Sequence, residues 1–186
     1  EMRILDYCAG GGGKALALAA ALQTGHVEAH DADSERLSRL LPRLRRSGLK
    51  NLELADLSRE SEYDLILVDA PCSSSGTIRR NPEIPWRWSR EDILRFSGRQ
   101  KDILQKAARR VKRGGRLVYA TCSLLLPENE GTVRAFLNEN KGFLPEPFHL
   151  GPVSDVPGAE HGMVRLPLNL TNYGGDGFFA ARFVRG

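Results

Sequence analysis

The opening segment constrains the fold most, because it places four consecutive glycines between a buried strand and a helix. Residues 2–7 have the apolar pattern of a strand, Gly10 to Gly13 follow, and residues 14–22 are rich in alanine and leucine. Glycine permits a tight turn and a close approach of the backbone to a ligand. In open α/β sheets, ligands bind at the carboxyl ends of strands, beside helix amino termini. The segment therefore predicts an α/β fold with a binding site at this turn.

The rest of the chain continues to alternate between short apolar runs and helical patterns. Further strands are predicted at residues 27–30, 51–55, 63–68 and 116–120, and helices at residues 35–47, 89–111 and 128–140. We expect Pro42 to interrupt the first of these helices and Gly98 to break the second. Two final strands, residues 163–166 and 178–183, have no helix between them, which indicates an antiparallel edge hairpin. The pattern predicts a mostly parallel sheet with helices on both faces.

Composition limits the class of protein. The 186 residues fit a single domain, predicted to span residues 1–186, with 41% hydrophobic and 27% charged residues. No apolar run reaches the ~20 residues needed to cross a bilayer, so we predict a cytoplasmic protein, taken to be a monomer, without a membrane segment. The three cysteines form no CxxC pair, and the four histidines show no ligand spacing, which predicts no metal site.

Basic residues indicate an anionic partner. The formal charge is +4, and one cluster mixes arginines with tryptophan: Arg79, Arg80, Trp86 and Arg87. Guanidinium groups bind phosphates and aromatic rings stack on bases, so these four residues are predicted to bind nucleic acid. Two other basic clusters, within residues 43–50 and 109–113, have a solvated helix face as the alternative interpretation.

The glycine-rich turn indicates a nucleoside cofactor. A phosphate-binding P-loop requires glycine at Cys8 and serine or threonine at Ala15, so that motif is absent. Gly10 and Gly12 with Ala15 fit a dinucleotide pattern, and Asp31 follows the second strand, where an acid binds ribose hydroxyls. Both a nicotinamide cofactor and S-adenosylmethionine contain such a ribose, so the turn leaves the two open.

Two cysteines follow neighbouring strands. Asp69-Ala70-Pro71-Cys72 comes after the fourth strand and Thr121-Cys122-Ser123 after the fifth, at the same sheet edge as the glycines. A thiolate is suited to adding at C6 of cytosine, which makes C5 nucleophilic toward a sulfonium methyl. A carboxyl group can stabilise the charge that spreads to N3, and a base must later remove the C5 proton. One acid and two cysteines fit this chemistry better than hydride transfer.

Four segments together resemble successive motifs of the RsmB/Sun (Fmu) family of RNA cytosine-C5 methyltransferases. They are DYCAGGGGK, DAPCSSSGTIRRNPEIPW, YATCSLLLPENE and DGFFAARF, between Asp6 and Phe183. The resemblance implies a Rossmann-like class I methyltransferase fold with a seven-stranded sheet. It implies Cys122 as the nucleophile, Cys72 as the residue that assists product release, and Asp69 at the cytosine N3 edge. The S-adenosylmethionine residues that it implies are Cys8, Ala9, Gly10, Gly11, Gly12, Gly13, Lys14, Asp31, Asp56 and Asp69.

The segment of residues 78–84 is similar to the branch of the family that acts on small-subunit ribosomal RNA, so ribosomal RNA is the expected substrate. Transfer RNA, a nicotinamide-dependent oxidoreductase and a non-catalytic RNA-binding domain are the alternatives. Gly11 departs from the family, which has proline there. Because the first strand begins beside Glu1, we interpret the chain as the catalytic part of a longer protein with RNA-binding modules upstream.

Overall fold

The computed structural model describes residues 1–147, 158–166 and 175–186. Within these residues, eight strands form one sheet in the order β3-β2-β1-β4-β5-β8-β6, with β7 also paired to β8. The strands are β1 (Met2–Asp6), β2 (Gly25–Ala29), β3 (Leu52–Leu54), β4 (Tyr63–Asp69), β5 (Val111–Thr121), β6 (Phe143–Pro145), β7 (Met163–Leu166) and β8 (Phe178–Arg185). The five strands from β3 to β5 are parallel, whereas β8 is antiparallel to β5, β6 and β7.

This sheet confirms the predicted fold class. The final two strands form the expected antiparallel pair, in which Met163 lies opposite Ala181 and Leu166 opposite Phe178. The sheet has one strand more than the seven that the resemblance implied, because the short strand β6 also pairs with β8. No helix within the described ranges is long and apolar enough to span a membrane.

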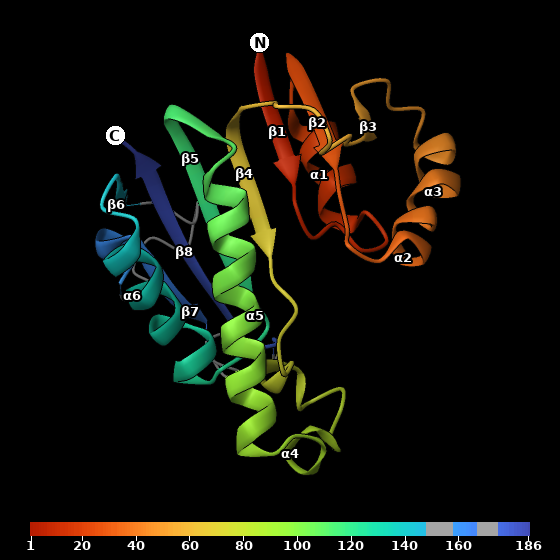
Figure 1. The fold of residues 1–186 in the computed structure, drawn as a ribbon. Helices are drawn as coiled ribbons and strands as arrows, with labels where there is room; N and C mark the ends of the chain where they lie inside the picture. The colour runs from red at the N-terminus through yellow and green to blue at the C-terminus, as the bar shows by residue number, and fades with distance from the viewer. Residues whose placement is uncertain (148–157, 167–174) are drawn as a thin grey trace.

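Helices cover both faces of the sheet (Figure 1). They are α1 (Gly13–Ala21), α2 (Ser34–Ser38), α3 (Leu40–Ser47), α4 (Ile84–Arg87), α5 (Arg90–Ala108) and α6 (Glu130–Glu139), with single 3₁₀ turns at η1 (Ser75–Thr77), η2 (Leu126–Glu128) and η3 (Ala159–His161). Alternation along β1 divides the core in two: Leu5 packs in the cluster that contains Leu104 of α5 and Phe136 of α6, whereas Ile4 packs in the cluster that contains Leu40 of α3. The α/β sandwich therefore follows from side-chain alternation in strands buried on both faces.

Two predicted helices differ in detail from the structure. The helix expected at residues 35–47 is divided at Arg39 into α2 and α3, and Pro42 lies in the first turn of α3, where its missing N–H is not needed. The helix expected at residues 89–111 is not broken at Gly98, so that prediction was wrong. A capping box between Ser89 and Asp92 begins α5, which then runs unbroken to Ala108.

Strand β5 is longer than the predicted residues 116–120. It begins at Val111, where the predicted helix was expected to end, and its register with β4 shifts between the Tyr63–Val111 and Leu65–Arg116 pairs, so Gly114 and Gly115 lie in the irregular part of the strand. Gly114 has a φ of 73°, which glycine adopts without strain. The two glycines that were expected to turn the chain into the strand therefore lie within it.

The loops after β4 and β5 are joined by backbone contacts. The Gly76 N–H donates to the Cys122 carbonyl at 2.9 Å, and the Gly177 N–H, just before β8, donates to the Gly76 carbonyl at 2.7 Å. A Cβ at Gly76 would overlap the Gly177 carbonyl, so only glycine fits there. This packing holds both cysteine loops against the start of β8.

Candidate active site

The glycine-rich turn orients Asp31. Gly10 and Gly12 have positive φ angles of 53° and 77°, and Gly12 is the residue that precedes α1. The Gly10 N–H donates to Asp31 Oδ2 at 2.7 Å, and the Asp33 N–H donates to Asp31 Oδ1 at 2.9 Å. The backbone thus fixes the Asp31 carboxylate beside the turn, and each oxygen has a further lone pair for a ligand hydroxyl.

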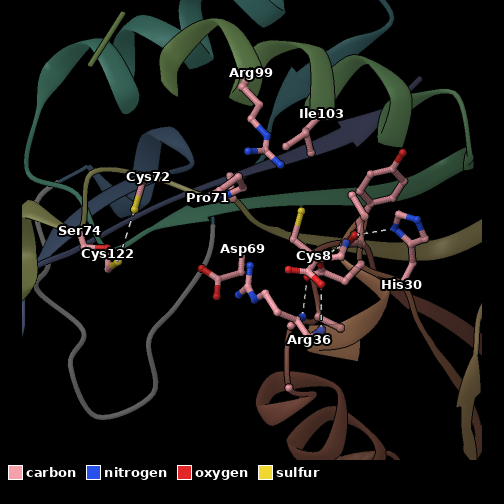
Figure 2. A pocket seen from close by; sticks show the side chains of 18 residues that line it. Cys8, His30, Arg36, Asp69, Pro71, Cys72, Ser74, Arg99, Ile103 and Cys122 are labelled. Carbon is pink, nitrogen blue, oxygen red and sulfur yellow. Dashed lines mark hydrogen bonds between the residues drawn. The ribbon is translucent and has the colours of Figure 1, made fainter. Parts of the chain in front are cut away.

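A cavity of about 550 Å³ lies at the carboxyl ends of β1, β2, β4 and β5. The proposed catalytic residues Asp69, Cys72 and Cys122 all line it (Figure 2). The predicted cofactor residues that line it are Cys8, Ala9, Gly10, Gly11, Asp31 and Asp69. The structure therefore brings the glycine-rich turn and both cysteine motifs to one cavity, as the strand order predicts.

Four predicted cofactor residues do not line this cavity: Gly12, Gly13, Lys14 and Asp56. Gly12 precedes α1 and Gly13 begins it, and the Lys14 ammonium pairs with Asp69 at 2.5 Å. Asp56 is exposed, and its carboxylate accepts hydrogen bonds from Ser58 and pairs with Arg59 at 3.0 Å. The assignment of Asp56 to the adenine stays a prediction.

Cys72 and Cys122 face each other at one end of the cavity (Figure 2). Their Sγ atoms are 3.4 Å apart, and the Ser74 hydroxyl lies 3.4 Å from Cys122 Sγ. Hydrogen bonds from Cys72 and Ser74 lower the pKa of Cys122 to about 6. The hydrogen bond to Cys122, together with burial, raises the pKa of Cys72. Cys122 therefore ionises first and Cys72 remains a thiol.

Cys8 differs from this pair although it lines the same cavity. Burial and the nearby charges of Asp31, Asp6 and Asp69 raise its pKa to about 12. A thiol in such a site is unreactive at neutral pH. Cys8 is thus suited to contact a ligand by packing and not by nucleophilic attack.

Asp6 does not line the cavity, but its charge acts on Cys8, which does, and the sequence reasoning did not single it out. Its side chain is 1% exposed, and neither carboxylate oxygen has a well-formed hydrogen bond. Burial, with the charge of Asp69, raises its pKa to about 7, against the opposing effects of Lys14 and the amides of Ala15 and Cys8. Its position before the glycines was visible in the sequence, but its burial was not.

The cavity also contains side chains from two helices that were not predicted as site residues. Arg36 extends from α2, and Arg99 and Ile103 extend from α5 (Figure 2). The two arginines bring positive charge to a cavity that also contains Asp31 and Asp69. The four-residue spacing of Arg99 and Ile103 indicates one helix face, but only the fold shows that this face overlies the cavity.

The predicted RNA-binding residues lie between β4 and α5, mostly on the surface. Trp86 is 84% exposed, and Arg79 is exposed. Arg80 pairs with Asp176 at 2.5 Å, and the Arg87 guanidinium lies 4.9 Å from the ring of Trp88. Trp88 in contrast is anchored, because its N–H donates to the Ser73 carbonyl at 3.0 Å. Exposure of Trp86 among arginines is compatible with base stacking.

Comparisons with known proteins agree with this geometry. Residues 1–184 match the family described as 16S rRNA methyltransferase RsmB/F. Ribosomal RNA small subunit methyltransferase B of Salmonella arizonae is 38% identical over 98% of this chain and 42% of that protein. The structure of PH0851 has a TM-score of 0.86 and 36% identity over 99% of this chain and 42% of that one. The structure of NSun6 from Pyrococcus horikoshii, solved with SFG, has a TM-score of 0.84 and 27% identity. The match covers 100% of this chain and 48% of that one.

The fold and the site define a Rossmann-like methyltransferase. The chain belongs to the RsmB/F family, and it spans less than half the length of the relatives just described. Family membership confirms the resemblance stated above and is incompatible with the nicotinamide-dependent oxidoreductase considered as an alternative. Within the described residues, no group of three or more metal-ligating side chains is present.

Proposed function

We propose that this chain transfers a methyl group from S-adenosylmethionine to C5 of cytosine in RNA, with small-subunit ribosomal RNA as the substrate. The observation that carries the proposal is the pair of cysteine Sγ atoms, 3.4 Å apart, in a cavity shared with the glycine-rich turn and Asp31. The names of the relatives at about 37% identity support ribosomal over transfer RNA. A substrate of this kind agrees with the predicted cytoplasmic location.

The residues present fit S-adenosylmethionine. Asp31 is held by two backbone N–H groups at the position that binds a ribose, and Gly10 and Gly11 offer a backbone surface without side chains. The NSun6 structure contains SFG, an analogue of S-adenosylmethionine, in a related fold. When bound, the cofactor supplies an electrophilic methyl group. Asp31, Cys8 and the glycines would hold it.

Cys122 would begin the reaction as a thiolate. The pKa of about 6 leaves it ionised at neutral pH, and its Sγ forms a bond to C6 of the cytosine. The electron pair of the C5–C6 double bond moves toward N3 and O2, where Asp69 in its protonated form would donate a hydrogen bond to N3. C5 thereby becomes nucleophilic and accepts the methyl group.

Cys72 would complete the reaction as the base. While Cys122 is a thiolate, a second negative charge 3.4 Å away is strongly unfavourable, so Cys72 keeps its proton. Once Cys122 is bonded to C6 it is a neutral thioether, and Cys72 can release its proton to solvent and become a thiolate. The Cys72 thiolate would then remove the C5 proton, the electron pair would restore the C5–C6 bond, and the Cys122–C6 bond would break.

The test compares Cys72→Ala with Cys122→Ala in this protein. Each variant is incubated with small-subunit ribosomal RNA and S-adenosylmethionine and run on a denaturing gel. We expect a covalent protein–RNA adduct with Cys72→Ala, because addition occurs but release does not, and none with Cys122→Ala. The same incubation with transfer RNA is the control for the choice of substrate. The reverse pattern would make Cys72 the nucleophile, and methylation without an adduct in any variant would contradict attack at C6.

A further inference from the structure

Beneath the two cysteines lies a buried carboxylate, that of Glu128, which the proposed reaction does not use. Glu128 is 0% exposed. Its Oε1 accepts from the Ser73 N–H at 2.8 Å and from Gln100 Nε2 at 3.0 Å. Its Oε2 accepts from the hydroxyls of Ser73 at 2.5 Å and Ser123 at 2.6 Å. One side chain therefore binds both residues that directly follow the cysteines, Ser73 and Ser123.

Glu128 is itself held firmly. The Tyr119 hydroxyl, from β5, donates to the Glu128 carbonyl, and Gln100, from α5, donates to the Pro71 carbonyl as well as to the carboxylate. Ser73, Gln100 and Ser123 are at most 1% exposed. The carboxylate is thus the centre of a dry network that joins the β4 loop, the β5 loop and α5. Such networks make geometry specific when every member is satisfied.

Burying a carboxylate in this position has a high desolvation free energy, so we expect it to have a role in arranging the two loops. All four of its donors are neutral, so no opposite charge offsets its desolvation. Two apolar side chains could fill the same space, but they could not bind two loops at once through directional hydrogen bonds. Glu128 does not line the cavity, so contact with a substrate does not explain it.

We propose that Glu128 is a positioning residue, which sets the separation of Cys72 and Cys122 by holding Ser73 and Ser123 on one carboxylate. The role in catalysis rests on the proposed function, but the effect on the two sulfur atoms does not. A shift of about 1 Å in a reacting group can cost about 100-fold in rate. Small movements of either loop are therefore enough to impair the reaction.

The first experiment measures how fast the two thiols form a disulfide in the absence of RNA, which depends on how close they lie. The full-length protein is treated with diamide, which takes up the two thiol hydrogens as one S–S bond forms, and the Cys72–Cys122 disulfide is followed by mass spectrometry. The variants are Glu128→Ala and Glu128→Gln. The control is Glu28→Gln, which alters a carboxylate that is 8% exposed and bound to Arg3 and Tyr63 at 2.5 and 2.8 Å.

We expect Glu128→Ala to form the disulfide roughly tenfold more slowly than the wild-type protein, because a misplaced thiol meets its partner less often. Glu128→Gln keeps the shape, and the serine hydroxyls can reverse to accept from its amide, so its rate should lie near that of the wild type. Glu28→Gln should not change the rate. A wild-type rate in Glu128→Ala would overturn the proposal, and if that variant does not fold, a wild-type rate in Glu128→Asp, whose side chain is one methylene shorter, would do so.

The second experiment measures methylation and cofactor affinity. We expect Glu128→Ala to reduce kcat about 100-fold with partial recovery in Glu128→Gln, while the Kd for S-adenosylmethionine changes less than about threefold. If the disulfide forms slowly but the wild-type protein methylates no RNA, the proposed function fails and the positioning role stands. If methylation is lost while the disulfide forms at the wild-type rate, Glu128 does not act by positioning.

Discussion

Lys14 and Asp69 form an ion pair across the rim of the cavity, with Nζ and Oδ2 2.5 Å apart. Lys14 belongs to the first turn of α1, and Asp69 ends β4, so the pair connects the glycine-rich turn to the first cysteine loop. The two side chains are 49% and 29% exposed, and solvent screens the interaction. Its main effect is therefore local, because the charges of Asp69 and Lys14 act in opposite directions on the pKa of Asp6.

Replacing Asp6 by asparagine should change how stability depends on pH. The pKa of Asp6 is raised from about 3.8 to about 7, so the folded chain binds a proton that the unfolded chain releases between these values. The free energy of unfolding therefore falls as pH rises through this window and levels off above it. The total penalty is on the order of 4 kcal/mol, from 1.36 kcal/mol for each pKa unit. Urea unfolding at pH 4 to 8 measures it.

Asp6→Asn should lack this fall in stability, whereas Asp56→Asn, a change at an exposed carboxylate, should retain it. The informative quantity is the difference in free energy of unfolding between Asp6→Asn and wild type at each pH. A difference that stays constant from pH 4 to 8 would contradict a raised pKa for Asp6.

Cys122 should react with iodoacetamide before Cys72 and Cys8, because its pKa is lowered and theirs are raised. Hydrogen bonds from Cys72 and Ser74 lower the pKa of Cys122, so Cys122 should be alkylated at pH 7, and the midpoint of its rate against pH should lie below that of an ordinary cysteine. Cys8, with its pKa raised to about 12, should remain unmodified at pH 8. Peptide mass spectrometry of samples taken from pH 5 to 8 gives the three rates separately. Ser74→Ala should move the Cys122 midpoint upward, because it removes one donor to the thiolate.

The adjacent glycines Gly12 and Gly13 should tolerate alanine very differently. Gly12 has a φ of 77°, and a Cβ there would overlap the Leu40 side chain. Gly13→Ala, in contrast, would meet only the end of Arg43, 4.0 Å away. We expect Gly12→Ala to lower the free energy of unfolding by about 1–3 kcal/mol and Gly13→Ala to leave it within about 0.5 kcal/mol. Equal effects of the two changes in chemical denaturation would argue against a left-handed turn at Gly12.

The two tryptophans should separate RNA affinity from stability. Trp86→Ala should weaken RNA binding by about 1–3 kcal/mol, the usual effect of losing one stacked base, and leave the Tm unchanged, since Trp86 is 84% exposed. Trp88→Ala should cost about 2 kcal/mol of stability, because Trp88 packs on Phe96 and donates to the Ser73 carbonyl. Fluorescence anisotropy with labelled RNA and thermal unfolding give the two quantities. Undiminished RNA affinity in Trp86→Ala would remove Trp86 from the RNA surface.

The sequence predicted that the glycine-rich turn and both cysteine loops meet at one cavity, because parallel strands share one carboxyl edge. Cys72 and Cys122 are 50 residues apart but follow neighbouring strands, and strand order alone brings them together. Gly98 shows the limit of local reasoning. An added Cβ there would meet nothing within 4 Å, so the glycine lies on an open face of α5. The helix continues through it although glycine lowers helix stability.

The hydrogen-bond partners of side chains in the loops were not accessible from sequence patterns. Glu128 reads as a surface residue in a polar segment, and only the fold shows that it is fully buried against Ser73 and Ser123. Asp56 likewise follows a strand at the correct edge, yet its carboxylate is bound by its neighbours Ser58 and Arg59. Periodicity predicts the face of a helix or strand on which a residue lies, but not the side chains or backbone groups with which it forms hydrogen bonds.

The place of β8 in the sheet has a consequence for synthesis. This last strand inserts between β5 and the edge strands, and Gly177 at its start holds Gly76 in the loop between the cysteines. A nascent chain that already contains both cysteines still lacks the partner that fixes their loops. The thiols therefore reach their working arrangement only when residues 177–185 have left the ribosome and paired with β5, so the reactive centre forms well after both cysteines have been synthesised.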